Sequence, residues 1–193
     1  MTLQSFPDVN EAAGWHSACR EGLSALEQIT LRSAKEPRQD WSQVQSLDDL
    51  SHRSIEEVCE YFEIKEQQHD VLATLAILAA CEGAIRRDLR WRADGDRGQL
   101  YRAQFLRLAE EQLAHKYIPI QKVLGKWRSV LRGSKQPHAV SHIQGIDTLF
   151  VQVRNRLAHG QLSANEFVFS VIHRRLVLAQ QKWKQAVSDF RGY

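Results

Sequence analysis

The segment RNRLAH gathers two guanidinium groups, an amide and an imidazole within six residues: Arg154, Asn155, Arg156 and His159. An imidazole can give or take a proton near neutral pH, and a guanidinium can hold a phosphoryl oxygen while negative charge develops on it. Together these side chains suit the cleavage of a phosphodiester. Gly160 follows directly, as is typical of the residue just beyond the end of a helix.

The spacing of Arg154 and His159 matters for this chemistry. On an ideal helix the five-residue step from Arg154 to His159 would turn the two side chains about 140° apart. If Gly160 ends the helix and the last turn unwinds, His159 can turn towards Arg154. The other interpretation is that His159 only complements the negative C-terminal end of the helix dipole.

A carboxylate interrupts the apolar stripe of an earlier, long helical segment. Glu82 stands in the gap of a series at three- and four-residue spacing: Val71, Leu75, Leu78, Ile85 and Leu89. A buried carboxylate without a cationic partner is costly, so we expect an arginine beside it. Two partners stay open: Arg86, one turn along the same helix, or an arginine from another helix, which Glu82 would orient.

The elements that must position these groups are expected to be helices throughout. Ser54 and Glu57 form a capping box at a helix start, and Asn165 is expected to cap the last helix. No window alternates with a period of two, so we predict an all-α, up-and-down bundle of about five to seven helices. The candidate helices cover residues 10–33, 54–62, 65–92, 100–117, 120–131, 139–158 and 165–190.

Composition limits the class of protein. The chain has 193 residues, of which 43% are apolar, with 10 Gly and 4 Pro. A chain of this length and apolar content can form a hydrophobic core without disulfides or bound metals. The three cysteines form no CxxC pair and no secretory leader is visible, so we expect a cytoplasmic location. The longest apolar stretch, residues 71–80, is far shorter than the roughly 20 residues that cross a bilayer, so no membrane partner is expected.

Charge is divided unevenly along the chain. Residues 1–70 carry 14 acidic and 6 basic side chains, whereas residues 71–193 carry 9 acidic and 20 basic ones. Eighteen of the 26 cationic side chains are arginines, whose planar fork binds phosphate through two hydrogen bonds. This excess suits a polyanionic partner and makes phosphate a candidate ligand; the alternative is that these arginines are simply scattered over helical surfaces.

The order Arg-Asn-x-x-x-His-Gly near a helix end, in a small all-α chain, resembles the signature of the HEPN superfamily. These helical domains carry an arginine, four to six residues, and then a histidine, and many are metal-independent ribonucleases. The segment ACEGAIRRDLRWR, residues 80–92, is similar to the family's earlier helix, in which an acidic residue packs against the motif arginine. The resemblance implies a HEPN-like domain over residues 51–193. Residues 1–50 would be an N-terminal helical extension of unknown role that covers the bundle or shields its cleft.

The resemblance also implies a role for each matched residue. Arg154 would bind the scissile phosphate, and His159 would transfer a proton or contact the phosphate. Asn155 would support their geometry, and Glu82 would orient Arg154. The RNA 2′-hydroxyl would attack the adjacent phosphate and leave a 2′,3′-cyclic phosphate, with no metal and no cofactor.

The expected partners follow from the same resemblance. Arg156 and Arg86 would contact the RNA, a tRNA or an mRNA, and a homodimer would place two motifs across one composite cleft. The chain would act as a toxin or a phage-defence effector, with an antitoxin or other regulatory partner. Relatives that are inhibited by adenylylation carry a tyrosine two residues after the histidine, where this chain has Gln161.

Other interpretations remain beside this one. His138 and His142 have the i, i+4 spacing of zinc ligands, but no HExxH motif and no neighbouring cysteine or acid completes such a site. Cys81 is expected to pack in the core. A non-enzymatic RNA binder would use Trp91 and Trp127 as stacking platforms. The last alternative is a catalytically inactive HEPN-like module for RNA binding, protein interaction or dimerisation.

Overall fold

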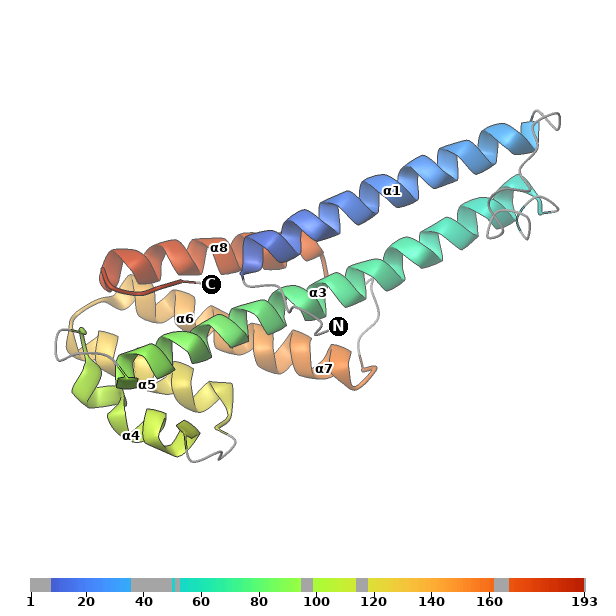
Figure 1. Cartoon of the computed structure of the whole chain (residues 1–193). Coiled ribbons are helices and arrows are strands. Elements are labelled where there is room, and N and C mark those ends of the chain that lie inside the picture. Colours follow the sequence, from blue (N-terminus) through green and yellow to red (C-terminus); the bar gives the residue numbers. More distant parts are fainter. Residues whose placement is uncertain are drawn as a thin grey trace.

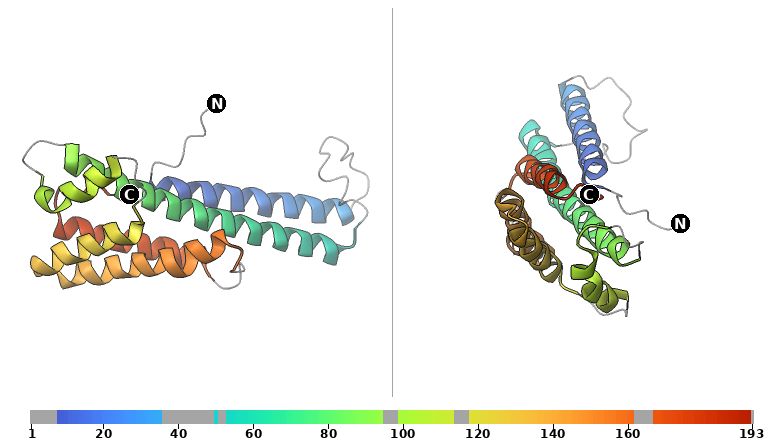
Figure 2. Two further views of the ribbon diagram at one scale, coloured as in Figure 1. Left: turned by 90° about the horizontal axis from the view of Figure 1, so that it is seen from below. Right: turned by 90° about the vertical axis from the view of Figure 1, so that its left-hand side faces the viewer.

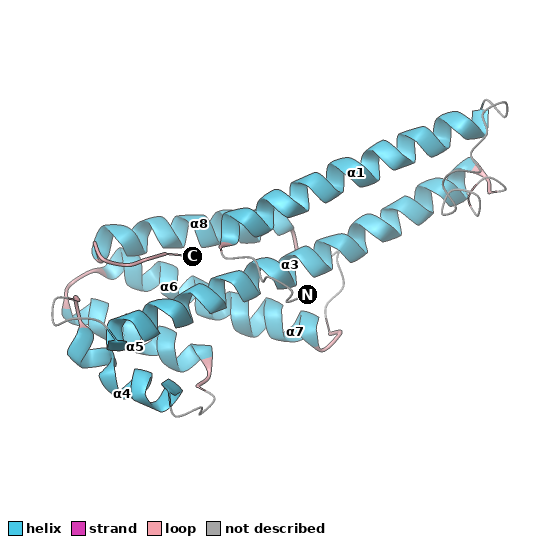
Figure 3. Ribbon diagram, in the orientation of Figure 1, coloured by secondary structure: helices cyan, strands magenta, loops and turns pink. Residues whose placement is uncertain are grey.

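The computed structural model describes residues 8–35, 50, 53–94, 99–113, 118–161 and 167–192. Every regular element in these ranges is helical, which confirms the all-α class (Figures 1 and 3). The elements are α1 Val9–Lys35, α3 Ile55–Asp94, α4 Arg102–Leu113, α5 Ile120–Gly133, α6 Pro137–Leu149, η1 Phe150–Arg154, α7 Asn155–Ala158 and α8 Phe169–Ala186. Because α6, the π-helical turn η1 and α7 run end to end, the described residues form six rods.

The longest rod, α3, is the axis of the molecule. Helix α1 runs antiparallel beside it, and the outer parts of both project beyond the other helices as a two-helix arm (Figures 1 and 2). The remaining rods gather around the inner half of α3, with α8 beside the start of α1 and the α6–α7 rod. None of the described helices combines the length and apolar character needed to cross a bilayer.

One hydrophobic core joins residues from both ends of the described chain. Val9 and Ala12 at the start of α1 belong to the same cluster as Val187 and Phe190 after α8. The start of α1 therefore contributes to the core of the bundle. At the far end of the arm, a second small cluster is built from Leu50, Val58 and Phe62.

Aromatic side chains fill the centre of the main core. Trp127 is fully buried and meets the ring of Trp183 edge-on, with 5.2 Å between ring centroids. The interpretation of Trp127 as a stacking platform for RNA is therefore wrong, because its ring faces other core residues. Trp91 is partly exposed, and the guanidinium of Arg191 lies 4.3 Å from the centre of its ring.

The start of α3 confirms the predicted capping box. The Ser54 N–H donates to the Glu57 carboxylate at 2.7 Å, and the Glu57 N–H donates to the Ser54 hydroxyl at 3.2 Å. The expected end of this helix near Phe62 is wrong, since α3 continues without a break to Asp94. The first part of α3 packs against α1, whereas its later part also contacts α4, α8, η1 and α7. The buried residues therefore lie on different sides of the helix in its two parts, although the backbone stays helical throughout.

The other helix ends differ from expectation by a few residues. Helix α6 begins at Pro137, where the missing N–H of proline costs no helical hydrogen bond. Helix α8 begins at Phe169 after Val168, and Asn165, the expected cap, lies outside the described residues. Helix α8 ends at Ala186 rather than near residue 190, because Val187 is extended (φ −137°, ψ 93°).

A fully buried arginine ties α3 to the C-terminal segment, and the sequence did not predict it. Arg92 binds the carboxylate of Asp88 at 2.9 and 3.2 Å and that of Asp189 at 3.0 and 3.3 Å. It also donates to the carbonyl oxygen of Leu100 at 2.6 Å. Its guanidinium lies 4.7 Å from the centre of the Trp127 ring. The only sequence signal was the i, i+4 spacing of Asp88 and Arg92 next to apolar positions.

Candidate active site

Glu82 lies on α3 with its side chain only 14% exposed, and its two carboxylate oxygens serve different partners. Oε1 accepts hydrogen bonds from Nε of Arg86 at 2.9 Å and from Nη2 of Arg86 at 2.7 Å. Oε2 lies 3.5 Å from Nη2 of Arg154, which comes from η1. The two partners left open by the sequence are thus both present, and the predicted pairing of Glu82 with Arg154 is confirmed.

Arg86 faces the protein. Besides its bonds to Glu82, its Nη2 atom donates to the carbonyl oxygen of Ile118 at 2.8 Å, and its side chain is 19% exposed. Arg86 therefore links α3 to the segment before α5 and fixes the Glu82 carboxylate from one side. This placement suits a positioning role better than the RNA contact suggested by the resemblance.

Arg154 is held from two directions but stays accessible. Its Nη1 atom donates to the amide oxygen of Asn155 at 3.1 Å, while Nη2 faces Glu82. Its side chain is 41% exposed, so part of the guanidinium can meet an oxyanion from outside. Asn155 thus contacts Arg154 as expected of a residue that supports its geometry.

Arg154 is the last residue of a π-helical turn that the sequence did not predict. The Asn155 N–H donates to the carbonyl oxygen of Phe150, five residues back, instead of the α-helical four. An uninterrupted helix was expected over residues 139–158, and the apolar pattern gives no sign of the wider turn. Such turns occur frequently at functional sites.

The motif ends where Gly160 was predicted to end it. Gly160 has φ +65°, its N–H donates to Leu157 O at 3.0 Å, and the Gln161 N–H donates to Arg156 O at 2.7 Å. This pair of bonds is the Schellman arrangement, in which a left-handed residue closes a helix. The last turn stays helical, because the His159 N–H still donates to the Asn155 carbonyl oxygen at 3.1 Å.

His159 is exposed, and its imidazole has no hydrogen-bond partner in the described part of the chain. No hydrogen bond joins it to Arg154 there. Arg156 is also exposed, and its Nη2 atom donates to the backbone oxygen of Gln161 at 3.2 Å. One protomer therefore presents a fixed guanidinium and a separate, open imidazole at the surface.

The local charge at this surface is positive. Among the described residues, the Glu82 carboxylate is set against the two guanidiniums of Arg86 and Arg154. A phosphate oxygen would accept a charge-assisted hydrogen bond from the exposed part of the Arg154 guanidinium while Nη2 still faces Glu82.

The remaining sequence candidates lie elsewhere. Among the described residues, no three His, Cys, Asp or Glu side chains gather as metal ligands, so His138 and His142 have no such group around them. Cys81 is fully buried, which confirms its place in the core, and burial raises the pKa of its thiol well above the usual range. A buried thiol of this kind is not a nucleophile at neutral pH.

No protein-family model, curated protein or solved structure matches this chain. The features that point to a function are therefore the motif itself and the geometry of Glu82, Arg86, Arg154, Asn155 and His159.

Proposed function

We propose that the protein is a metal-independent endoribonuclease of the HEPN type. The observation that carries the proposal is the Glu82–Arg154 ion pair, which holds a partly exposed guanidinium next to Asn155 in the helical segment that ends at His159. A phosphate-binding arginine and a histidine able to transfer protons at neutral pH are the two groups that RNA cleavage by an internal nucleophile requires.

The proposed reaction uses the RNA 2′-hydroxyl as nucleophile. A base removes the 2′ proton, the 2′ oxygen forms a bond to the adjacent phosphorus, and the bond from phosphorus to the 5′ oxygen breaks. An acid protonates the leaving 5′ oxygen, so the products are a 2′,3′-cyclic phosphate and a 5′-hydroxyl. Arg154 stabilises the charge that builds on the non-bridging oxygens, and His159 supplies proton transfer. DNA lacks the nucleophile and should resist.

A homodimer would complete the site. Base and acid catalysis together call for two proton-transfer groups, whereas one protomer presents one motif imidazole, which does not touch its own Arg154. Two motifs facing one another across a shared cleft would bring His159 of each protomer to one phosphate. The open position of His159 supports this arrangement.

Within this site, Arg86 and Glu82 are positioning residues. Arg86 binds one oxygen of Glu82 and the Ile118 carbonyl, and Glu82 offers its other oxygen to Arg154. This chain of contacts fixes the guanidinium of Arg154 before substrate binds, which lowers the cost of ordering it in the transition state.

In a cell, we propose a toxin or phage-defence effector acting on RNA in the cytoplasm, with tRNA or mRNA as target and an antitoxin or other partner restraining it. The basic half of the chain supports an RNA target, because 20 of its side chains are cationic and 9 acidic.

One observation favours a second candidate function. Because Arg154 and His159 do not meet within one protomer, a catalytically inactive HEPN-like module that binds RNA or dimerises would present the same surface. Such a module would bind RNA without cutting it.

The test is cleavage of total RNA and tRNA by the purified protein in excess EDTA, beside Arg154→Ala and His159→Ala. His138→Ala is the matched control, since this exposed histidine lies on the same rod but outside the motif. Cleavage by the parent and the control alone, with cyclic-phosphate ends, supports the ribonuclease. RNA binding by all variants with no cleavage by any supports the inactive module.

A further inference from the structure

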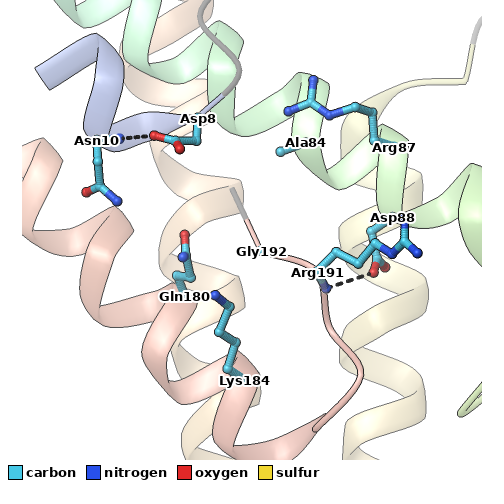
Figure 4. Close-up of a pocket in the computed structure, with 9 residues that line it drawn as sticks. All are labelled: Asp8, Asn10, Ala84, Arg87, Asp88, Gln180, Lys184, Arg191 and Gly192. Carbon is cyan, nitrogen blue, oxygen red and sulfur yellow. Dashed lines mark hydrogen bonds between the residues drawn. The ribbon is translucent and has the colours of Figure 1, made fainter.

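A cavity of about 430 Å³ lies between the start of α1, helices α3 and α8, and the C-terminal segment (Figure 4). Its wall includes Asn10, Arg87, Gln180, Lys184 and Arg191. Arg87 is about 140° around α3 from Glu82, so the cavity lies on another face of that helix from the candidate active site. The volume is in the range of small-molecule sites, which runs from roughly 300 to 1,000 Å³.

The two carboxylates in the wall already have donors from the protein itself. Asp8 accepts hydrogen bonds from the backbone N–H groups of Asn10 at 2.8 Å and Glu11 at 2.9 Å, where it caps α1. Asp88 is bound by the buried Arg92, and the Arg191 N–H points to it at 3.4 Å. The wall thus combines two engaged acids with three cationic side chains, and its net charge is positive.

The amine of Lys184 is placed by a close approach of the backbone. Lys184 and Gln180 extend from α8 towards Gly192 (Figure 4). Gly192 has φ +83°, and a Cβ atom on it would lie 2.7 Å from Cε and 2.9 Å from Nζ of Lys184. A side chain at Gly192 would be strained in this backbone conformation, and its Cβ atom would push the flexible end of Lys184 aside. The C-terminal segment therefore lies against the end of the Lys184 side chain in the cavity wall.

We propose that this cavity binds the phosphate group of a small phosphomonoester of mononucleotide size. Lys184 of α8 and Arg87 of α3 both line the cavity, and they carry the charged donors that phosphate prefers. The side-chain amides of Asn10 and Gln180 supply donors and acceptors for the rest of the ligand. This site is separate from the proposed ribonuclease site and goes beyond that function.

The test measures binding of inorganic phosphate and of adenosine monophosphate to the full chain by isothermal titration calorimetry, in the His159→Ala background. Because binding is read without RNA cleavage, failure here and failure of the ribonuclease proposal are distinguishable. Lys184→Gln and Arg87→Gln should each weaken binding about tenfold or more, the loss of one charged hydrogen bond. Lys182→Gln, on the same helix but bonded to Gln185, is the matched control and should bind like the parent.

Gly192→Ala gives an independent check, since it displaces the Lys184 amine without removing its charge, and it should also weaken binding. Circular dichroism shows that each variant is folded. Tighter binding of the nucleotide than of phosphate confirms the mononucleotide class. Equal affinity of the Lys182 and Lys184 variants, or no heat from either probe with the parent, would overturn the proposal.

Discussion

Glu82 and Arg154 form an ion pair of 3.5 Å between α3 and the π-helical turn. The same carboxylate accepts two hydrogen bonds from Arg86 through its other oxygen. One acid thus sets the position of an arginine that is remote in sequence, while a local arginine fixes the acid. Removing any of the three groups changes the charge balance of the other two, which makes this chain of contacts testable residue by residue.

Replacing His159 by alanine should abolish most RNA cleavage and leave the fold intact. The imidazole is exposed and has no partner in the described residues, so little packing is lost. Loss of a general acid or base lowers a rate by about 10² to 10⁴. Cleavage rates and urea unfolding of the variant are compared with those of His138→Ala. Equal rates in both variants would remove His159 from the mechanism.

Glu82→Gln should act on the rate through Arg154. The neutral amide no longer attracts the guanidinium, and a displacement of about 1 Å can lower a rate about a hundredfold. We expect kcat to fall while KM changes little, because the arginine is still present to bind RNA. Steady-state kinetics measure the separate effects on kcat and KM.

Arg86→Lys, which keeps a charge beside Glu82, should recover part of the activity lost in Arg86→Ala. Identical kinetics for these two variants would argue against a positioning role.

Stability should fall in mild acid because of His173. Phe169 lies 3.8 Å from His16 and 6.2 Å from His173 between ring centroids, and His16 in turn binds Asp70 of α3. Burial, together with nearby His16, lowers the pKa of His173 below its ordinary value of 6.5. The unfolded chain therefore takes up this proton at a higher pH than the folded one, and acidification favours unfolding. Urea unfolding at about pH 7.5 and 5.5 should show a smaller pH effect in His173→Gln than in the parent.

Breaking the buried arginine network should cost much more than a surface change. Arg92→Met leaves Asp88 buried without its main partner, so we expect the free energy of unfolding to drop by about 3 to 5 kcal/mol. The double variant Asp88→Asn with Arg92→Met should recover part of that loss, since no charge is then left buried. Urea denaturation of the single and double variants measures their free energies of unfolding. If the losses in the two single variants simply add up in the double variant, Asp88 and Arg92 are not coupled.

Replacing glycine by alanine should change the stability of the protein in opposite directions at Gly160 and Gly145. A Cβ atom meets nothing within 4 Å at Gly160 or at Gly145, so space does not distinguish them. Gly160 has φ +65°, where a side chain costs roughly 1 to 2 kcal/mol, so Gly160→Ala should destabilise. Gly145 lies inside α6, where alanine is favoured by roughly 0.5 to 1 kcal/mol. Thermal unfolding of both variants measures the contrast.

Local chemistry explains what the sequence could predict. The capping box of Ser54 and Glu57 and the helix end at Gly160 depend on residues a few positions apart, and both have the expected bonds. The cationic partner of Glu82 was expected because a carboxylate on an apolar stripe needs one. The choice of Arg154 came from the resemblance of the motif.

What the sequence could not predict depends on contacts between distant segments. The π-helical turn before Asn155 leaves no mark in the apolar pattern. From the sequence alone, Arg92 would be placed at the surface. In the fold it is buried, because Asp189 and the Leu100 carbonyl oxygen accept its hydrogen bonds. The sequence did not show that α3 continues past Phe62, because its apolar positions change sides along the helix. The first part of α3 packs against α1, and the later part packs against several helices. The cavity at Lys184 requires Gly192 to return over α8.

The shared core of the two chain ends also fixes the order in which the protein can assemble. Val9 and Ala12 come from the first described helix, whereas Val187 and Phe190 come after the last one, yet they belong to a single cluster. During synthesis the face of α3 that packs against α8 therefore stays uncovered until α8 has been made. Closure of the core is thus a late event between remote segments, a topology associated with slower folding than that of local helical hairpins.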